Sequence, residues 1–461
     1  MKKFREEHDM IGTKKIFDDC YYGIQTERAM ENFQISKISL SKYPEFVKAI
    51  CQVKKAVAQA NFKFEEINKE KSDAIIKACD LIISGKYIDQ FPVDIIQGGA
   101  GTSTNMCANE VIANIALELC GHKKGDYEFI HPNNHVNLSQ STNDVYPTAI
   151  RIATVTYCEE LEKELNLLKL SFEKKGTEFN DVIKMGRTQL QDAVPMTSGQ
   201  EFNAWAVTIG EDIQRLQDAK KLLLEINLGG TAIGTGLNAP KNFSKVVTEI
   251  LSKNTGRDFE CAENLIEATQ DCGSYIQFSG TLKRIAAKIS KICNDLRLLS
   301  SGPRTGINEI NLPARQPGSS IMPGKVNPVI PEVVNQVAFA VIGNDVTITL
   351  AAEAGQLELN AMEPIISFKL FSSILHMTRA FNTLRLNCID GITANKQRCK
   401  ELVDNSIGIV TVMCPIIGYE KSCQIAKEAL ETGKSVFDLV LEKEYLSKEK
   451  LQKLLNTSSM C

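Results

Sequence analysis

The sequence predicts a mainly α-helical protein in which several long helices form a central bundle. Apolar residues recur at spacings of three and four over stretches that exceed the ~11-residue average helix. The period-two alternation that is typical of half-buried strands is hard to find anywhere in the chain. With 461 residues, the chain is long enough for about three domains of roughly 150 residues each.

Four segments carry the helical periodicity most clearly. The apolar positions of each segment fall on one face of a helix, so each face is expected to pack against other helices. In chain order these positions are Leu161, Leu165, Leu168 and Phe172; Phe202, Trp205, Ile209, Ile213, Leu216 and Leu223; Leu282, Ile285, Ala286, Ile289, Ile292, Cys293, Leu296 and Leu299; and Val333, Val334, Val337, Ala338, Val341 and Ile342.

Segments rich in Gly, Pro and Asn interrupt these helices and indicate where domains begin and end. We place an N-terminal, mostly helical domain at residues 1–140, a central long-helix bundle at 141–394 and a small C-terminal helical domain at 395–461. The stretch 333–354 carries few charges, which predicts burial on more than one face. One chain rarely buries so much, so we expect several chains to assemble.

Composition excludes several classes of protein. The formal net charge is -3, from 53 basic and 56 acidic side chains, and no basic stripe favours nucleic acid. The N-terminus lacks the apolar region of a signal peptide, and no apolar run approaches the ~20 residues that cross a bilayer. The 14 cysteines show neither a C-x-x-C pair nor a zinc-binding spacing. We therefore expect a cytoplasmic protein with reduced thiols, no dedicated metal site and no membrane or nucleic-acid partner.

The loop 318–328, with the sequence GSSIMPGKVNP, is equipped to hold an anion. Its Gly and Pro residues forbid regular structure, and consecutive backbone N–H groups from Ser319 to Met322 could form an anion-binding nest. Lys325 adds a cation, and Asn327 adds an amide. An ordinary Gly/Pro linker explains the same composition, so the residues alone leave both interpretations open.

Three other polar segments also allow two interpretations. They are residues 98–109 (GGAGTSTNMCAN), 139–144 (SQSTND) and 185–195 (MGRTQLQDAVP). Their hydroxyl and amide groups could bind a ligand, but Ser, Thr, Asn and Asp also cap helices routinely. The glycine-rich run 229–236 lacks the G-K-[ST] of a phosphate loop, and we interpret it as a turn between helices.

Together, and in this order, the four polar segments resemble those of the aspartase/fumarase superfamily. The superfamily's signature loop is present in full at 318–328, and the similarity runs from Tyr21-Tyr22-Gly23 to residues 431–436. Ala100 and Gln189 favour the aspartase branch, because fumarases have serine and histidine there. The resemblance implies a three-domain lyase fold with a tetrameric multi-helix core. It also implies that L-aspartate is converted reversibly to fumarate and ammonium.

The resemblance further implies a role for each polar segment. Removal of the C3 proton of aspartate gives a carbanion that delocalises into the β-carboxylate, and Ser319 is the implied base. Lys325 and Asn327, helped by Thr188, are implied to hold the α-carboxylate, and Asn143 to meet the amino group.

The doubly charged intermediate requires preorganised neutral donors, so we expect Thr102, Ser141 and Thr142 to hold the β-carboxylate. An amide at position 189 does not titrate, which makes it doubtful as a general acid. Candidates for supporting positions are Gln189, Glu332, Ser320, Ile321 and Met322.

Long helices separate the four segments, and segments at opposite ends of helices ~30 Å long cannot all meet within one chain. The superfamily builds each site from three chains of a homotetramer, and we expect the same here. A second anion site is suggested near His131, Asn133 and Asn134, where a surface helix cap is an alternative. We expect that no cofactor is required, and activation by a divalent cation stays open.

Two other functions remain as alternatives. Fumarate hydratase has the same fold and the same carbanion chemistry, with water in place of ammonia. A non-enzymatic scaffold or binding protein on the lyase fold belongs to another class. The complete set of Ser319, Lys325, Asn327, Thr102 and Asn143 argues against the scaffold.

Overall fold

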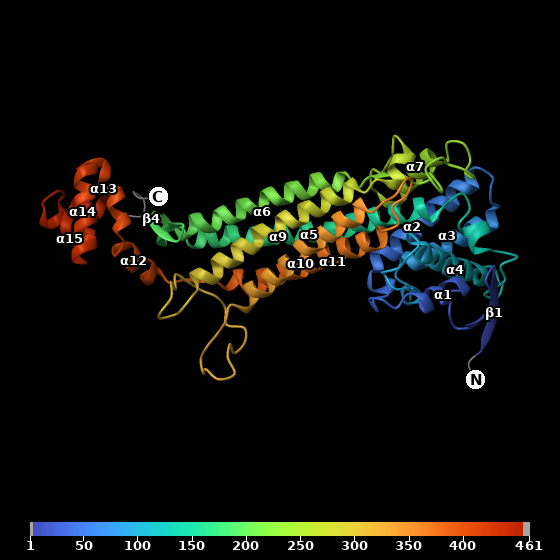
Figure 1. The fold of residues 1–461 in the computed structure, drawn as a ribbon, viewed down its shortest axis with the longest axis horizontal. Coiled ribbons are helices and arrows are strands. Elements are labelled where there is room, and N and C mark those ends of the chain that lie inside the picture. Colours follow the sequence, from blue (N-terminus) through green and yellow to red (C-terminus); the bar gives the residue numbers. More distant parts are fainter. Residues whose placement is uncertain (1–2, 455–461) are drawn as a thin grey trace. The chain divides into compact units, whose positions relative to one another are not determined.

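The computed structural model describes residues 3–454 and is dominated by helices (Figure 1). The predicted mainly α-helical class is therefore confirmed. The chain divides into two compact units. The first contains the residues through 162, 214–284 and 340–376, and the second contains 163–213, 285–339 and the residues from 377 onward. The three-domain division at 140 and 394 stays a prediction.

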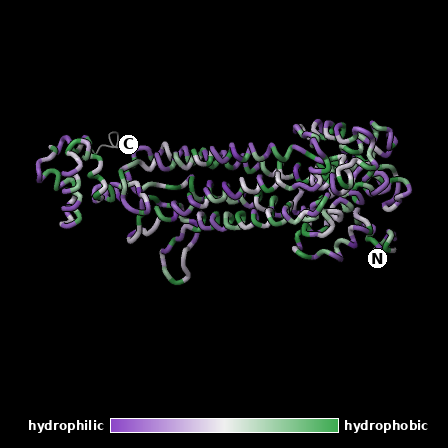
Figure 2. Tube along the Cα trace, turned by 45° about the horizontal axis from the view of Figure 1, so that its top comes forward, coloured by the Kyte–Doolittle hydropathy of each residue, from purple (hydrophilic) through white to green (hydrophobic). Residues whose placement is uncertain are grey.

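Five long helices have residues in both units. They are α5 (Thr142–Glu178), α6 (Ser198–Lys221), α9 (Gly273–Leu299), α10 (Val329–Glu353) and α11 (Glu363–Asn387). The four segments with predicted periodicity lie in α5, α6, α9 and α10, which confirms them as helices, although Leu223 falls just beyond the end of α6. Figure 2 shows hydrophobic and hydrophilic residues interleaved along these helices, as packing of one face requires.

The first unit also contains shorter helices around α4 (Thr102–Leu119), which is buried on every face from Thr104 to Leu117. The helix α3 (Lys69–Ile83) packs against α4, and α2 (Pro44–Lys63) packs against both α3 and α7 (Phe243–Thr255). The remaining elements are the antiparallel pair β1 (Phe4–Asp9) and β2 (Gly12–Phe17), α1 (Ile24–Asn32), η1 (Leu40–Lys42), η2 (Ile88–Gln90), the π-helix η3 (Pro132–Val136), α8 (Leu265–Gln270), and the parallel pair β5 (Glu225–Ile226) and β6 (Glu260–Cys261).

The second unit also holds a β-hairpin and the C-terminal helices. Antiparallel strands β3 (Ile183–Thr188) and β4 (Gln191–Thr197) pack against α12 (Lys396–Asp404) and η5 (Ile407–Ile409). The other elements are α13 (Val410–Ile417), α14 (Tyr419–Thr432), α15 (Val436–Glu442), α16 (Lys448–Leu454), η4 (Ile389–Gly391), and the antiparallel pair β7 (Ile310–Asn311) and β8 (Thr393–Ala394). Buried hydrophobic side chains of the hairpin and of these helices form one core, whose first and last members in the sequence are Met185 and Leu451.

The hairpin corrects the sequence interpretation, which treats residues 186–195 as an interruption between helices. Its turn residues Gln189 and Leu190 both have positive φ, 54° and 62°, as a type I′ turn requires. Such turns favour Asn-Gly and Asp-Gly, and neither pair occurs here. Rules that recognise turns from the sequence therefore do not identify this hairpin.

Helix α10 corrects a second expectation. By length and composition it could cross a membrane, although no such segment is expected from the sequence. However, its Asp345 is 5% exposed and accepts hydrogen bonds from Ser279 and Lys283 at 2.8 and 2.6 Å. These contacts join α10 to α9, as expected of a helix that packs within a bundle. Several of its large apolar side chains are 41–63% exposed: Val333, Phe339, Val346 and Leu350. An apolar stripe of this kind on a bundle helix is typical of contacts between chains.

Candidate active site

The polar segments predicted to carry the chemistry fall in both units. Segments 98–109 and 139–144 belong to the first unit, and segments 185–195 and 318–328 belong to the second. Within the first unit, its two segments contact each other directly.

A strained glycine-rich loop determines where α4 begins. Gly99, Ala100 and Gly101 have φ values of 86°, 55° and 88°, in the left-handed region that favours glycine. A Cβ atom at Gly101 would lie 2.4 Å from the Tyr146 ring, so no larger residue fits there without displacing α5. The loop places Thr102 in the first turn of α4, where its hydroxyl donates to the Gly99 carbonyl at 2.7 Å.

The polar segment 139–144 caps the start of α5. The Ser141 hydroxyl accepts a hydrogen bond from the Asn143 backbone N–H at 3.2 Å, and the Asp144 carboxylate accepts one from the Ser141 N–H at 3.0 Å. The capping interpretation of this segment is thus observed. The Asn143 side chain donates to the Ala232 carbonyl at 2.7 Å, which fixes the orientation of its amide.

One hydrogen bond joins the starts of the two helices. The Asn105 Nδ2 donates to Oγ1 of Thr142 at 3.0 Å, so the first turns of α4 and α5 lie next to each other. Each helix N-terminus carries a partial positive charge, and side chains cap part of each first turn: the Thr104 N–H donates to Gln97 Oε1 and the Asn143 N–H to Ser141 Oγ. With the hydroxyls of Thr102 and Ser141 nearby in sequence, this arrangement favours a carboxylate without requiring a cationic side chain.

The glycine-rich run 229–236 packs against the start of α5. The Asp144 side chain is fully buried, and its Oδ2 accepts backbone N–H bonds from Gly229 and Thr231, both at 3.0 Å. Burial raises the pKa of Asp144 to about 6, while the N–H donors and Lys54 oppose the rise. The predicted turn at 229–236 is confirmed. Its contact with α5 could not be read from composition.

In the second unit, the loop 318–328 folds around Ser319. The Ser319 Oγ accepts hydrogen bonds from the backbone N–H groups of Ile321 at 3.2 Å and Met322 at 2.9 Å. Two of the backbone donors that the sequence predicts as a nest therefore bind the serine oxygen itself. Two such donors stabilise negative charge on this oxygen and so favour its ionised form.

The two ends of this loop are held together at Gly318. Its N–H donates to the Lys325 carbonyl at 2.7 Å, and its own carbonyl accepts a bond from Asn327 Nδ2 at 2.7 Å. A Cβ at Gly318 would lie 2.8 Å from the Asn327 backbone nitrogen, so this closure requires glycine. Ser319, Met322 and Lys325 line a cavity of about 500 Å³.

Thr188 and Gln189 lie exposed at the tip of the β3–β4 hairpin, whose base is held by buried charges. The Glu309 carboxylate is 1% exposed and lies 2.7 Å from the Arg187 guanidinium and 3.0 Å from the Lys184 amine. Sequence reasoning missed Lys184 and Glu309, because a charged residue gives no sign that the fold will bury it.

At the predicted second anion site, the His131 side chain caps the start of η3. The Nδ1 of His131 accepts bonds from the backbone N–H groups of Asn133 and Asn134 at 3.0 and 3.2 Å. Burial lowers the pKa of His131, which favours the neutral imidazole that such acceptance requires. His131 and Asn133 also line a cavity of about 430 Å³. The cap is observed, and an anion in this cavity stays a prediction.

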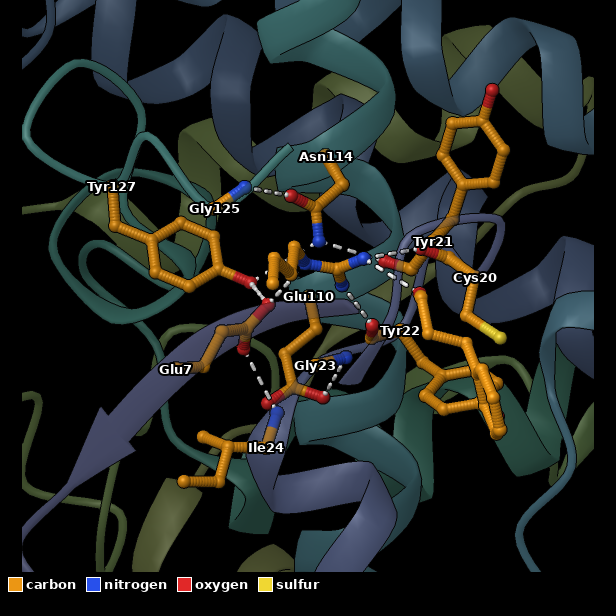
Figure 3. Close-up of polar contacts among 12 residues, drawn as sticks. Glu7, Cys20, Tyr21, Tyr22, Gly23, Ile24, Glu110, Asn114, Gly125 and Tyr127 are labelled. Atoms are coloured by element: carbon orange, nitrogen blue, oxygen red, sulfur yellow. Dashed lines mark hydrogen bonds and ion pairs between the residues drawn. The ribbon is translucent and has the colours of Figure 1, made fainter. Parts of the chain in front are cut away.

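Two buried carboxylates fix the N-terminal segment against α4 (Figure 3). Glu110 accepts the Gly23 N–H at 2.8 Å, and Glu7 accepts the Ile24 N–H at 2.9 Å. These N–H groups belong to the start of α1, where the helix dipole favours negative charge. Burial raises the pKa of Glu110 to about 7. The cluster stabilises the helix whose first turn carries Thr102.

The other residues predicted to support the site take no part in the hydrogen bonds described above. Ser320 is exposed in the loop, and Glu332 is partly buried in the first turn of α10. Among residues 3–454, no group of three or more His, Cys, Asp or Glu side chains is arranged to hold a metal ion.

Comparisons with known proteins point to one family, and its relatives match 99% of this chain. A family model described as "Lyase" matches residues 12–343, and one described as "Fumarase C C-terminus" matches residues 409–461. Relatives named aspartate ammonia-lyase include those of Helicobacter pylori, 58% identical over 99% of this chain and 97% of the relative, and of Escherichia coli strain K12, 55% identical over 99% and 96%.

Solved structures show the same fold. A structure titled fumarate lyase:delta crystallin from Brucella melitensis, described as bound to cobalt, has a TM-score of 0.96 and 52% identity, covering 99% of both chains. A class II fumarase from Schistosoma mansoni has a TM-score of 0.93 and 34% identity, again covering 99% of both chains.

Proposed function

The chain belongs to the lyase family that includes the aspartate ammonia-lyases and fumarases, and on that premise we propose the roles its residues take in catalysis. It is a carbon–nitrogen lyase that converts L-aspartate reversibly to fumarate and ammonium, as its relatives of 55–59% identity indicate. The observation that carries the proposed mechanism is the Ser319 Oγ, which accepts two backbone N–H bonds in the signature loop.

Ser319 acts as the base in this proposal. As an alkoxide, its Oγ takes the proton from C3 of aspartate, and the electron pair of that bond first moves into the β-carboxylate. The pair then forms the C2–C3 double bond as the C2–N bond breaks and ammonia leaves. The proton on Ser319 is then released to the departing ammonia, which gives ammonium and restores the alkoxide. A neutral serine is a poor base, so the N–H donors of Ile321 and Met322 support this role.

The paired starts of α4 and α5 hold the β-carboxylate in this proposal. Its negative charge doubles in the intermediate, so donors that are already oriented stabilise the transition state more than the substrate. Thr102, Ser141 and Thr142 supply hydroxyls, and the two helix N-termini supply N–H groups and partial positive charge. Losing one oriented donor typically costs about 2.7–4 kcal/mol of transition-state stabilisation.

The α-amino and α-carboxylate groups of aspartate require different partners. We assign the α-carboxylate to Lys325, Asn327 and Thr188, because an ammonium, an amide and a hydroxyl all donate to an anion. Asn143 meets the amino group, since its amide also carries an acceptor oxygen.

We propose that the enzyme is a homotetramer in which three chains contribute to each site. Helix α5 has 37 residues between the Thr142 and Thr188 segments, and a straight helix of that length is about 55 Å long. The exposed apolar side chains of α10 support burial between chains. We further propose that the enzyme is soluble and cytoplasmic, and that no cofactor is required, with activation by a divalent cation left to experiment.

The substrate is tested directly by following fumarate formation from L-aspartate and, separately, from malate, each with and without magnesium. We expect fumarate from aspartate and at most a trace from malate, because Ala100 and Gln189 replace residues of the fumarases. Faster turnover of malate would identify a hydratase instead. No turnover of either acid would leave a non-enzymatic scaffold.

A further inference from the structure

Lys54 is a fully buried lysine to which the proposed mechanism gives no role. It lies in α2, and its Nζ donates to the side-chain Oδ1 of Asn137 at 2.8 Å. Burial lowers the pKa of Lys54 to about 7, although the nearby Asp144 carboxylate opposes the fall. Because burying an amine is costly, its position calls for a function other than simple packing.

The first consequence of Lys54 concerns Asn137. In its protonated form Lys54 only donates hydrogen bonds, so the Asn137 atom that then faces it must be the amide oxygen, as observed. This oxygen also faces two amide groups of α4, which must therefore present their NH₂ ends. They do so at 3.1 Å from Asn105 Nδ2 and 3.2 Å from Asn109 Nδ2.

The second consequence concerns Asn105. Its Nδ2 carries two hydrogens, of which one reaches Asn137 and the other reaches Oγ1 of Thr142 at 3.0 Å. Among residues 3–454, the buried Oδ1 of Asn105 has no hydrogen-bond partner. An unpaired buried oxygen is unfavourable, and rotation of the amide would instead set two oxygens against each other. The hydrogen bond to Asn137 therefore fixes the orientation of the Asn105 amide, so that its NH₂ group faces the Thr142 hydroxyl.

The third consequence concerns Thr142. A hydroxyl has one hydrogen to donate and lone pairs that accept. The NH₂ of Asn105 occupies a lone pair of the Thr142 Oγ1, so the hydroxyl hydrogen points elsewhere. Within the part of the chain that the structure describes, this hydroxyl donates to no other residue. Its hydrogen is thus available to a ligand at the starts of α4 and α5.

We propose that Lys54 is a positioning residue that, through Asn137 and Asn105, makes Thr142 a hydrogen-bond donor toward the β-carboxylate of the substrate. The inference rests on the proposed function, in which Thr142 binds that carboxylate. Lys54 itself does not touch the substrate. Its ammonium fixes which end of each amide faces the next, and so determines the direction of the last hydrogen bond.

A double-mutant cycle with Lys54→Met and Thr142→Val tests this role. We expect Thr142→Val to lower kcat/KM by about 100-fold, as loss of an oriented donor does, and Lys54→Met to lower it by roughly tenfold. In the Thr142→Val background, Lys54→Met should have almost no further effect, because the hydroxyl it orients is gone. Full multiplication of the two effects would overturn the proposal.

The cycle separates failure of this inference from failure of the proposed site. If Thr142→Val alone leaves kcat/KM unchanged, Thr142 does not hold the carboxylate, and the proposed site is wrong. The Lys54→Met variant should fold, because methionine is an unbranched apolar side chain that removes the cost of burying an amine at this fully buried position. Circular dichroism and thermal unfolding check this point.

A second pair of variants tests the direction of the bonds even if Lys54→Met does not fold. Asn105→Asp replaces the NH₂ on Thr142 with an acceptor, so the Thr142 hydroxyl would turn and donate inward. The matched control is Asn109→Asp, which changes the same group on the same helix beside Asn137 without touching Thr142. Asn105→Asp should lower kcat/KM at least tenfold more than Asn109→Asp does. Equal losses would refute the proposal.

Discussion

The side-chain amide of Asn227 donates a hydrogen bond to the backbone carbonyl of Asn143 at 3.0 Å. This carbonyl lacks its usual helical partner, because residue 147, four positions further along α5, is proline and has no N–H. Asn227 supplies the missing donor and also donates to the Thr269 hydroxyl at 3.0 Å. A proline near the start of α5 is thus tolerated because a side chain from another segment satisfies the free carbonyl.

Replacing Asn227 should therefore weaken both the fold and the site. Asn227→Leu leaves the partly buried Asn143 carbonyl unpaired, which should cost about 1–3 kcal/mol of unfolding free energy and raise KM for aspartate. Urea denaturation and steady-state kinetics measure the two effects. The exposed Asn254→Leu should change stability by less than about 0.5 kcal/mol. A similar loss in both variants would contradict this account.

Gly101 and Gly85 form a matched pair for the loop before α4. Both have positive φ, 88° and 97°, but a Cβ at Gly101 meets the Tyr146 ring, whereas one at Gly85 meets nothing within 4 Å. Gly85→Ala should lose roughly 1 kcal/mol of stability from backbone strain alone. Gly101→Ala should lose about 1–3 kcal/mol more, because the overlap forces the packing apart. Thermal unfolding distinguishes the two, and equal losses would contradict the contact with Tyr146.

Ser319→Ala tests the proposed base. A general base typically contributes 10²–10⁴-fold, so kcat should fall below about one-hundredth of the wild-type value while the protein stays folded. Ser300→Ala, at the end of α9, removes an exposed hydroxyl that donates to the Arg297 carbonyl and should keep full activity. A folded Ser319→Ala enzyme with more than about a hundredth of wild-type turnover would end the assignment.

Glu110 should make stability depend on pH. Burial raises its pKa to about 7 in the folded protein, above the ordinary value of a glutamate. The folded state therefore binds this proton more tightly than the unfolded state does. Its stabilising effect is complete below the unfolded pKa and is lost as pH rises through about 7.

The melting temperature should accordingly fall between about pH 5 and pH 8, with part of the fall due to Glu110. Glu110→Gln cannot titrate and should show a smaller fall, whereas the exposed Glu118→Gln on the same helix should behave like the wild type. Differential scanning calorimetry across this range measures the difference. Identical pH profiles for Glu110→Gln and the wild type would contradict the pKa shift.

Much of the helical fold could be predicted, because α6, α9, α10 and the second half of α5 bury one face each and that face repeats every three to four residues. The polar loops could also be recognised as candidate sites from their hydroxyls, amides and glycines. Their chemical roles, above all that of Ser319, come from the resemblance, because a serine in a loop has no intrinsic basicity.

Other features could not be predicted, because they depend on partners that are far away in sequence. Lys54 and Asn137 are 83 positions apart, and nothing local marks either residue as buried beside the other. Arg187 and Glu309, separated by 122 positions, present the same difficulty. Such pairs exist only once the helices have packed, so sequence periodicity carries no information about them.

The proposed three-chain site predicts the outcome of mixing inactive enzymes. If Ser319 and Thr142 of one site come from different chains, Ser319→Ala and Thr142→Val chains can complement each other. In a mixed tetramer, some sites receive Ser319 from a Thr142→Val chain and Thr142 from a Ser319→Ala chain. Random mixing of equal amounts should restore up to about a quarter of wild-type activity, because each position is then intact half of the time.

The control for this experiment is a pair of variants in the same loop. Ser319 and Lys325 lie in one continuous segment, closed by the hydrogen bond between Gly318 and the Lys325 carbonyl, and so enter a site from the same chain. Mixing Ser319→Ala with Lys325→Met should therefore restore nothing, after the same unfolding and reassembly. If the Ser319→Ala and Thr142→Val mixture also stays inactive while mixed tetramers are demonstrated by mass spectrometry, then each site is built within one chain. That result would remove the reason for inferring that activity requires the tetramer.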